Sequence, residues 1–160
     1  MENFIQLKKD NVVRIGIKDQ YGKNTGEHLE FDLEDIEMPL RYQECLELHK
    51  KNEKNLEHQF IIIERREDVK GKKLLSKNEE DKIKALNEFY KKEMVALDLF
   101  LGEGMTQKIL NIMGRRPYVS MIDDIVEALE PVLPILKSNS DVAIEKIKNK
   151  YKIKEEKTLE

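Results

Sequence analysis

Cys45 and His49 are the residues whose types and spacing could do chemistry. They lie four positions apart, which places both side chains on one face of a helix. A thiol beside an imidazole can serve as a nucleophile with its base, or as two ligands of a metal ion. Neither site can be completed from the sequence, because the other histidines, His28 and His58, lie in unrelated contexts and no orienting carboxylate can be assigned. We therefore interpret Cys45 as a core cysteine beside a helix-surface histidine.

Other segments contain residue types that could take part in chemistry, but none of them forms a recognisable site. Asp123 and Asp124 are adjacent, so they point in different directions on a helix and do not form an acid–base pair. Two glycine–lysine segments, residues 22–25 and 71–73, lack the G-x-x-x-x-G-K-[ST] spacing that cradles a phosphate. The Gly-Glu-Gly step at residues 102–104 is better explained as a break between helices than as an anion site. We expect a protein that is not an enzyme and has no metal and no cofactor.

The pattern of the chain predicts an α+β fold, mostly α, with an N-terminal β-hairpin packed on a bundle of about four to five helices. Apolar and polar residues alternate on both sides of a loop with two glycines, which predicts a hairpin over residues 12–33. A first helix is predicted from Pro39 to about residue 64. Its apolar face repeats every three or four residues: Cys45, Leu48, Asn52, Leu56, Phe60 and Ile63.

The second half of the chain contains several helix boundaries. Ser76 followed by Glu79 is a capping box that starts a helix ending at Gly102. The expected inward stripe of that helix is Ile83, Leu86, Tyr90, Leu97 and Leu101. A short helix over residues 104–113 closes at Gly114, and another begins near residue 120 with Ile122, Ile125, Val126 and Leu129 facing inward. After Pro131 and Pro134, the pair Ser140-Asp141 is expected to cap a last helix.

Length and composition predict one domain over residues 1–151, with its helical part at 39–151, followed by a charged, disordered tail at 152–160. Hydrophobic and charged residues make up 39% and 38% of the 160 residues, which suits slender helices with one apolar stripe. The single cysteine excludes an internal disulfide and fits a reducing compartment. No segment approaches the roughly 20 apolar residues of a membrane span, so we expect no membrane partner.

The charges are distributed unevenly along the chain. Residues 27–37 carry six acids and no base, whereas residues 65–77 carry six bases and two acids. These runs are either solvated faces or complementary patches. On the second interpretation the protein is a homo-oligomer in which acidic residues of one copy meet basic residues of the next. The acidic set is Glu30, Asp32, Glu34 and Asp35, and the basic set is Arg65, Arg66, Lys70, Lys72 and Lys73.

Three stretches resemble a known family. They are residues 28–40 (HLEFDLEDIEMPL), residues 97–110 (LDLFLGEGMTQKIL), and residues 121–129 (MIDDIVEAL) followed by Pro131. Their order is similar to that in the tail assembly chaperones of long-tailed bacteriophages and prophages of Gram-positive bacteria. The resemblance implies a non-enzymatic protein of the host bacterial cytoplasm that covers the tape-measure protein during tail assembly. It also implies the tail tube protein as a possible second partner, and it offers no catalytic residues to carry over.

Four methionines lie around the glycine step, and methionine supplies an adaptable apolar surface for a partner. The expected partner-binding residues are Met94, Gly102, Gly104, Met105, Met113 and Met121; ordinary core methionines are the alternative. Two other functions stay open. One is a structural tail or connector component that is retained in the phage particle. The other, which we favour less because no aromatic residues interleave the basic runs, is a small regulatory protein that binds nucleic acid.

Overall fold

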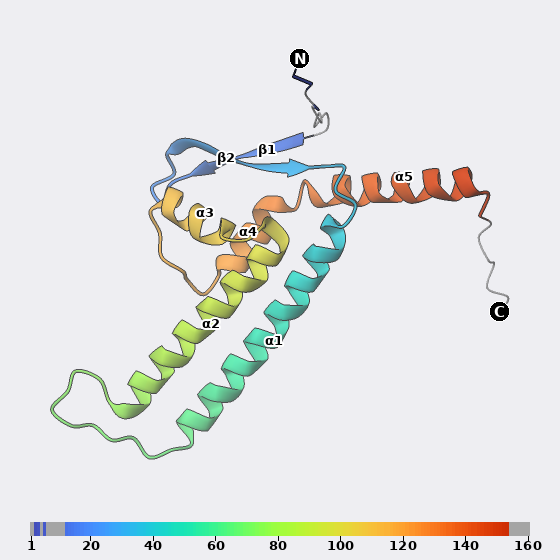
Figure 1. The fold of residues 1–160 in the computed structure, drawn as a ribbon. Coiled ribbons are helices and arrows are strands. Elements are labelled where there is room, and N and C mark those ends of the chain that lie inside the picture. The colour runs from blue at the N-terminus through green and yellow to red at the C-terminus, as the bar shows by residue number, and fades with distance from the viewer. Residues whose placement is uncertain (1, 4, 6–11, 154–160) are drawn as a thin grey trace, which may run out of the picture.

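A computed structural model describes residues 12–153 together with residues 2, 3 and 5, so most of the predicted tail, residues 154–160, lies outside the described residues. The elements follow the order β1, β2 and then α1 to α5 (Figure 1). The predicted class, α+β and mostly α with an N-terminal hairpin, is confirmed.

The hairpin consists of β1 (Val12–Lys18) and β2 (Asn24–Asp32), which pair antiparallel with Val13 opposite Phe31 and Ile15 opposite Leu29. Alternation places its apolar side chains on the face toward the helices, where Ile17 and Phe31 are buried. In the connecting loop the Asp19 carboxylate accepts hydrogen bonds from the backbone amides of residues 21 and 23, both at 2.9 Å. Two strands alone are marginal in water, so this packing is what stabilises the hairpin.

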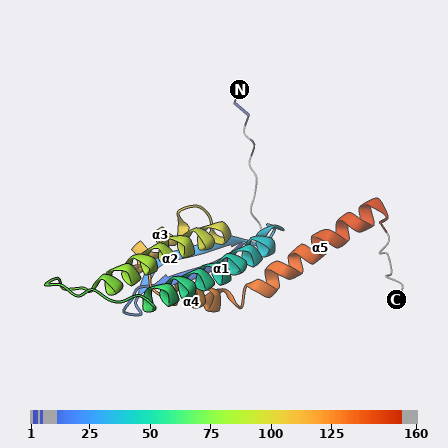
Figure 2. The same cartoon turned by 90° about the horizontal axis from the view of Figure 1, so that it is seen from below.

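The helices α1 (Met38–Glu64) and α2 (Lys77–Leu101) run side by side as an antiparallel arm that extends beyond the hairpin (Figures 1 and 2). The capping box at the start of α2 is confirmed, because the Ser76 hydroxyl accepts a hydrogen bond from the Glu79 amide at 3.2 Å. The predicted stripe of α2 was partly wrong, since Ile83 is 52% exposed. The buried stripe follows a different set at helical spacing: Ala85, Phe89, Glu93, Ala96, Leu97 and Phe100.

The chain reverses between α2 and α3 (Met105–Met113) through the predicted glycine step. Gly102 has φ 117° and ψ 153°, and Gly104 has φ 75°, which are conformations that favour glycine. The Asp98 side chain fixes the corner by accepting from the amides of Gly104 at 3.0 Å and Thr106 at 2.9 Å. Helix α4 (Met121–Leu129) then crosses back beneath the hairpin.

Helix α5 (Leu133–Tyr151) corrects one sequence prediction, because it continues through Ser140 and Asp141 without a break. The Ser140 hydroxyl lies 3.1 Å from the Leu136 carbonyl, one turn earlier in the same helix, and 3.3 Å from the Ile36 carbonyl. It therefore donates to a carbonyl instead of capping a helix start. Pro134 lies in the first turn of α5, where a missing N–H costs nothing. The C-terminal half of α5 runs clear of the rest of the molecule (Figure 1).

The main core lies where the hairpin, the adjoining ends of α1 and α2, α3, α4 and the start of α5 meet. Phe100 is its centre, with its ring 6.2 Å from that of Phe31 and 5.4 Å from that of Tyr42. The buried members are Phe31, Leu33, Met38, Cys45, Ala96, Leu97, Phe100, Leu110, Met121, Ile122, Leu129, Val132 and Leu136.

Candidate functional site

A polar cluster lies inside the α1–α2 interface and contains His49. The His49 Nδ1 atom is 2.6 Å from Glu93 Oε2, and its Nε2 atom is 3.0 Å from Glu53 Oε1. Asn52 Nδ2 donates to the other Glu93 oxygen at 2.9 Å. His49 is 9% exposed and Glu93 only 2%. The prediction that His49 is a surface histidine was therefore wrong, because α2 supplies a carboxylate partner that lies 44 residues away in the sequence.

Glu93 is the residue of this cluster that the sequence interpretation missed. It occupies a position of the buried stripe, four residues from both Phe89 and Leu97, and a charged residue at such a position was the available signal. Burial raises the pKa of the Glu93 carboxyl, while hydrogen bonds from Asn52 and His49 act in the opposite direction. Buried carboxylates are costly unless they are paired and hydrogen-bonded, and both oxygens of Glu93 have such partners.

Cys45 lies one turn before His49 and is 1% exposed, as expected for a core cysteine. Burial, and secondarily the charge of Glu93, raise the pKa of the Cys45 thiol to about 11. The thiolate is the reactive form of cysteine, so this side chain stays a thiol at neutral pH. Within the part of the chain that the structure describes, no three histidine, cysteine or acidic side chains are placed to hold a metal ion.

An apolar groove of about 360 Å³ lies between the hairpin, α3 and α4. Its floor consists of buried core residues, among them Ile17, Leu110 and Leu129. Partly exposed side chains from all three elements form its rim: Ile15, Leu29, Met113, Tyr118 and Ile125. The guanidinium of Arg115 lies over the Tyr118 ring, 3.7 Å from its centroid, which holds that ring in place. The groove is thus an apolar surface with a buried floor and a partly exposed rim.

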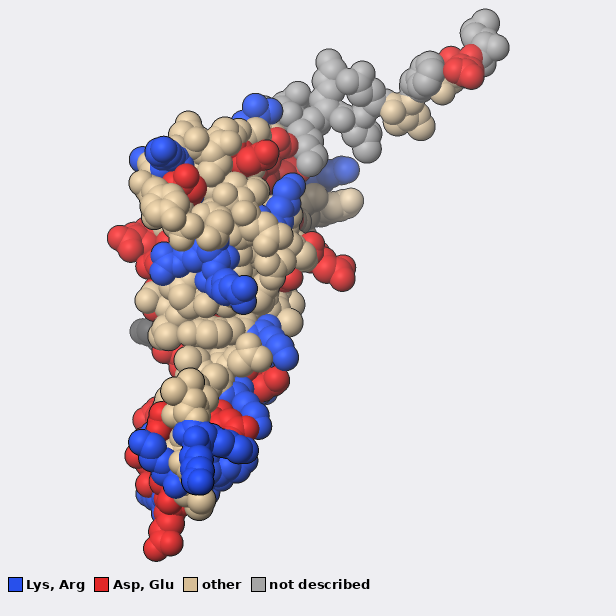
Figure 3. Space-filling view, turned by 90° about the vertical axis from the view of Figure 1, so that its left-hand side faces the viewer, with Lys and Arg blue, Asp and Glu red and all other residues tan. Residues whose placement is uncertain are grey.

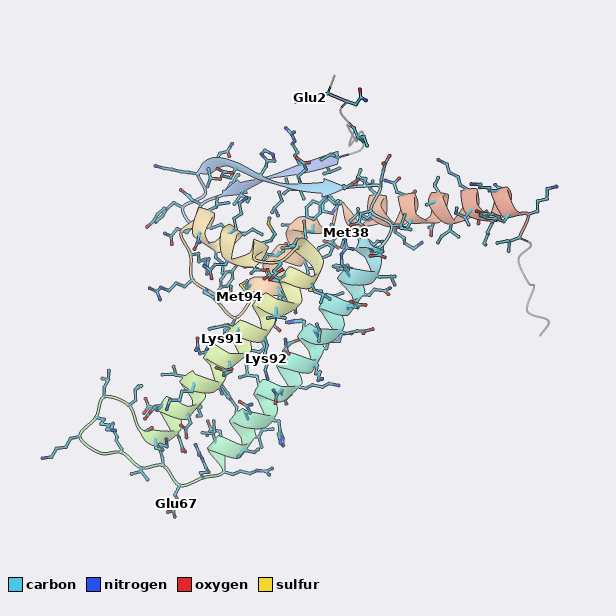
Figure 4. The ribbon with its side chains drawn as sticks, in the orientation of Figure 1. Glu2, Met38, Glu67, Lys91, Lys92 and Met94 are labelled. Carbon is cyan, nitrogen blue, oxygen red and sulfur yellow. The ribbon has the colours of Figure 1, made fainter. Side chains whose placement is uncertain are left out.

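The structure divides the predicted partner-binding methionines into two groups. Met113 and Met121 both line the groove, Met113 at the rim and Met121, 1% exposed, at the floor. Met94 lies near the C-terminal end of α2 (Figure 4), and its carbonyl is 3.5 Å from the Thr106 hydroxyl. Met105 starts α3 beside Gly102, so Met94, Met105 and both glycines belong to the α2–α3 corner.

The basic and acidic runs lie at opposite ends of the α1–α2 arm. The basic connector between the two helices forms the tip, where lysine and arginine side chains gather (Figure 3). Several residues predicted for self-association already have partners in the same chain. Arg66 pairs with Asp81 at 2.8 Å, Glu30 with Arg14 at 3.7 Å, and Asp35 with Arg41; Asp32 accepts from the Glu34 amide at 3.0 Å. The exposed members of the predicted sets are Glu30, Glu34, Arg65, Arg66, Lys70, Lys72 and Lys73.

Comparison with known proteins found no family model, no curated protein and no solved structure that matches this chain. Among its described helices, none combines the length and the apolar character needed to cross a membrane.

Proposed function

We propose that the protein is a non-enzymatic tail assembly chaperone of a long-tailed bacteriophage or prophage, acting in the cytoplasm of a Gram-positive host. It binds and covers the tape-measure protein until the tail tube polymerises around it. The observation that carries the proposal is the apolar groove between the hairpin, α3 and α4. The resemblance of residues 28–40, 97–110 and 121–129 to this family supports the same conclusion.

The groove has the properties that transient cover of an apolar chain requires. Its rim side chains come from three elements, and Met113 at the rim is unbranched and can adapt to different apolar residues. Lys18, Asp19 and Asp124 add polar groups at its edge. Amphipathic helices bind such grooves by inserting side chains spaced three or four residues apart. We infer that an apolar helix face of the tape-measure protein is the occupant.

The potentially reactive side chains support the non-enzymatic part of the proposal. His49, Glu93 and Asn52 satisfy one another between α1 and α2, and Cys45 is a buried thiol. These side chains hold the two long helices together, which is a structural role.

The test is co-expression with the tape-measure protein encoded in the same phage or prophage genome, followed by affinity capture. Met113→Lys places a charge at the groove rim and should reduce capture about tenfold, or about 1.4 kcal/mol. Val95→Lys is the matched control, because Val95 is an apolar residue of α2 that is 65% exposed and lies away from the groove. Both variants should melt within a few degrees of the wild type. Capture of the tape-measure protein by Met113→Lys at the wild-type level, or no capture by the wild type, would refute the proposal.

Two observations separate the remaining functions. A structural component retained in the particle should appear in mass spectra of purified particles, whereas an assembly chaperone should be absent from them. The basic tip of the arm is the feature that favours nucleic-acid binding, which would show a steep loss of affinity with salt. Gene order adds a third criterion, because a chaperone gene should lie between those for the tail tube and the tape measure.

A further inference from the structure

The apolar stripe of α5 continues beyond the point where the helix leaves the body. Leu133, Leu136, Ser140, Ile144, Ile147 and Tyr151 follow one another at spacings of three or four, so they share one face of the helix. Leu136 at the start is 2% exposed, whereas Ile144, Ile147 and Tyr151 are 53%, 52% and 64% exposed. Asn139 and Ser140 tie the first half of α5 to the body by donating hydrogen bonds to the carbonyls of Leu33 and Ile36. The C-terminal half of α5, which we call the free half because it extends away from the body (Figures 1 and 2), therefore presents an apolar face whose described side chains are about half exposed.

A second apolar pocket lies at the other end of the same helix. It has a volume of about 550 Å³ and lies between the first turns of α1 and α5. Leu40, at its mouth, is 60% exposed. The other apolar lining residues are Pro39, Tyr42, Leu133, Pro134 and Leu136. We call this the root pocket.

We propose that two copies of this chain pair through α5 in antiparallel orientation, with the free half of each α5 lying in the root pocket of the other copy. The free half cannot reach its own root pocket, because α5 is one continuous helix and Ile147 lies eleven residues, about 16 Å, along it from Leu136. Both copies use the same surface in this contact, so the assembly closes as a two-fold symmetric dimer.

Charge determines the antiparallel orientation. Residues 144–152 carry four lysines and one glutamate, so parallel pairing would place lysines against lysines. Acids outnumber bases around the root pocket. Glu130 and Lys137 both line it, and Glu34 and Glu37 lie exposed in the turn to which the middle of α5 is bound. Arg41 pairs with Glu37 and Asp35 in that turn, so the acids in excess are those without such a base. Antiparallel pairing places the basic end of one helix against this acidic end of the other, which is favourable. This self-complementarity is what identifies a second copy as the occupant.

Sedimentation of the full chain over about 1–100 µM, in about 1 M salt, tests the dimer. At that salt the Debye length is about 3 Å, so assemblies held by surface charges alone dissociate. The wild type should be a dimer. Ile147→Glu should weaken dimerisation at least tenfold, and so should Leu40→Lys at the root pocket. The matched control is Val142→Glu, because Val142 is 50% exposed but points about 140° away around the helix from Ile147; this variant should remain dimeric.

Orientation is tested with Tyr151→Cys under oxidising conditions. In the antiparallel pair the two introduced thiols lie about 30 Å apart, beyond the reach of a disulfide, so no linked dimer should form. A wild type that stays monomeric, equal loss of dimer in Val142→Glu and Ile147→Glu, or rapid disulfide linkage of Tyr151→Cys would each overturn the inference. The dimer goes beyond the proposed function and is separable from it, since Ile147→Glu leaves the groove intact and should still capture the tape-measure protein.

Discussion

Replacing Glu93 is the most informative perturbation of the fold, because this carboxylate is the buried link between α1 and α2. Glu93→Ala removes the acceptor of the Asn52 amide at 2.9 Å and the partner of His49 at 2.6 Å. Each buried polar group left without a partner costs about 1–3 kcal/mol, and Glu93→Ala leaves two such groups, the Asn52 amide and the His49 ring. We expect a loss of about 3–5 kcal/mol, which corresponds to a fall in Tm of about 6–20 °C for a domain of this size.

Glu93→Gln should behave differently because it retains both contacts. Its carbonyl oxygen can accept from Asn52, and its amide can donate to His49 Nδ1. Burial raises the pKa of the Glu93 carboxyl in the folded protein above the value of about 4.3 in an unfolded chain. The stability contributed by this group is therefore complete below about pH 4 and is lost as the pH rises through the raised folded pKa. Relative to the wild type, Glu93→Gln should become more stable as the pH increases.

Urea unfolding of wild type, Glu93→Gln and Glu93→Ala between about pH 4 and 8 measures both effects. Glu88→Gln is the matched control, because Glu88 lies on the same helix with its side chain 61% exposed. The difference between wild type and Glu93→Gln should change with pH, and the difference between wild type and Glu88→Gln should stay nearly constant. A Glu93→Gln difference that is flat across this range, or a Glu93→Ala cost below about 1 kcal/mol, would show that the carboxyl is not desolvated between the helices.

The Cys45 thiol, with its pKa raised to about 11, should resist a thiol reagent at pH 8 in the native protein and react fully once the protein is unfolded; reaction of the native protein would contradict its burial. Gly102→Ala should cost about 2–3 kcal/mol in urea melts, because φ is 117° and a Cβ would lie 3.2 Å from Met105 Cγ. Gly104→Ala should cost only about 1 kcal/mol, since a Cβ there meets nothing within 4 Å; equal costs would show that crowding at Gly102 is absent. If residues 27–37 of one copy meet residues 65–77 of another, species larger than a dimer should sediment at low salt and disappear at high salt, whereas salt-independent sedimentation would exclude that contact.

The hairpin and most helix boundaries could be predicted because their signals are local. Alternation over residues 12–33 and the Ser76–Glu79 capping box each specify their element without reference to distant parts of the chain. The pair Ser140-Asp141 led to a wrong prediction of a helix start, because that prediction also used only local sequence. A serine followed by an aspartate is typical of a helix start, but here the stripe from Leu133 to Tyr151 runs through it and the hydroxyl bonds to carbonyls.

The polar cluster and the groove could not be predicted because they depend on how distant elements pack. His49 was recognisable from the sequence as a potentially reactive residue. Its partner Glu93, however, follows only from the way α1 packs against α2. Of the predicted partner-binding residues, Met113 and Met121 line the groove, whereas Ile15, Ile17 and Leu29 complete it from the hairpin. Helical periodicity identifies the face of a helix, but it does not identify what lies opposite.

The shape of the molecule explains why apolar surface remains open at two separate places. A two-stranded sheet is too narrow to cover α3 and α4 completely, which leaves the groove beside Met113. A helix of 19 residues whose hydrogen bonds to the body lie at Asn139 and Ser140, within its first half, leaves Ile144, Ile147 and Tyr151 at least half exposed. Closing either surface within one chain would require further elements, whereas association with other chains buries both. The composition that predicted slender helices thus leaves two apolar surfaces, for which we propose a tape-measure helix in the groove and a second copy along α5.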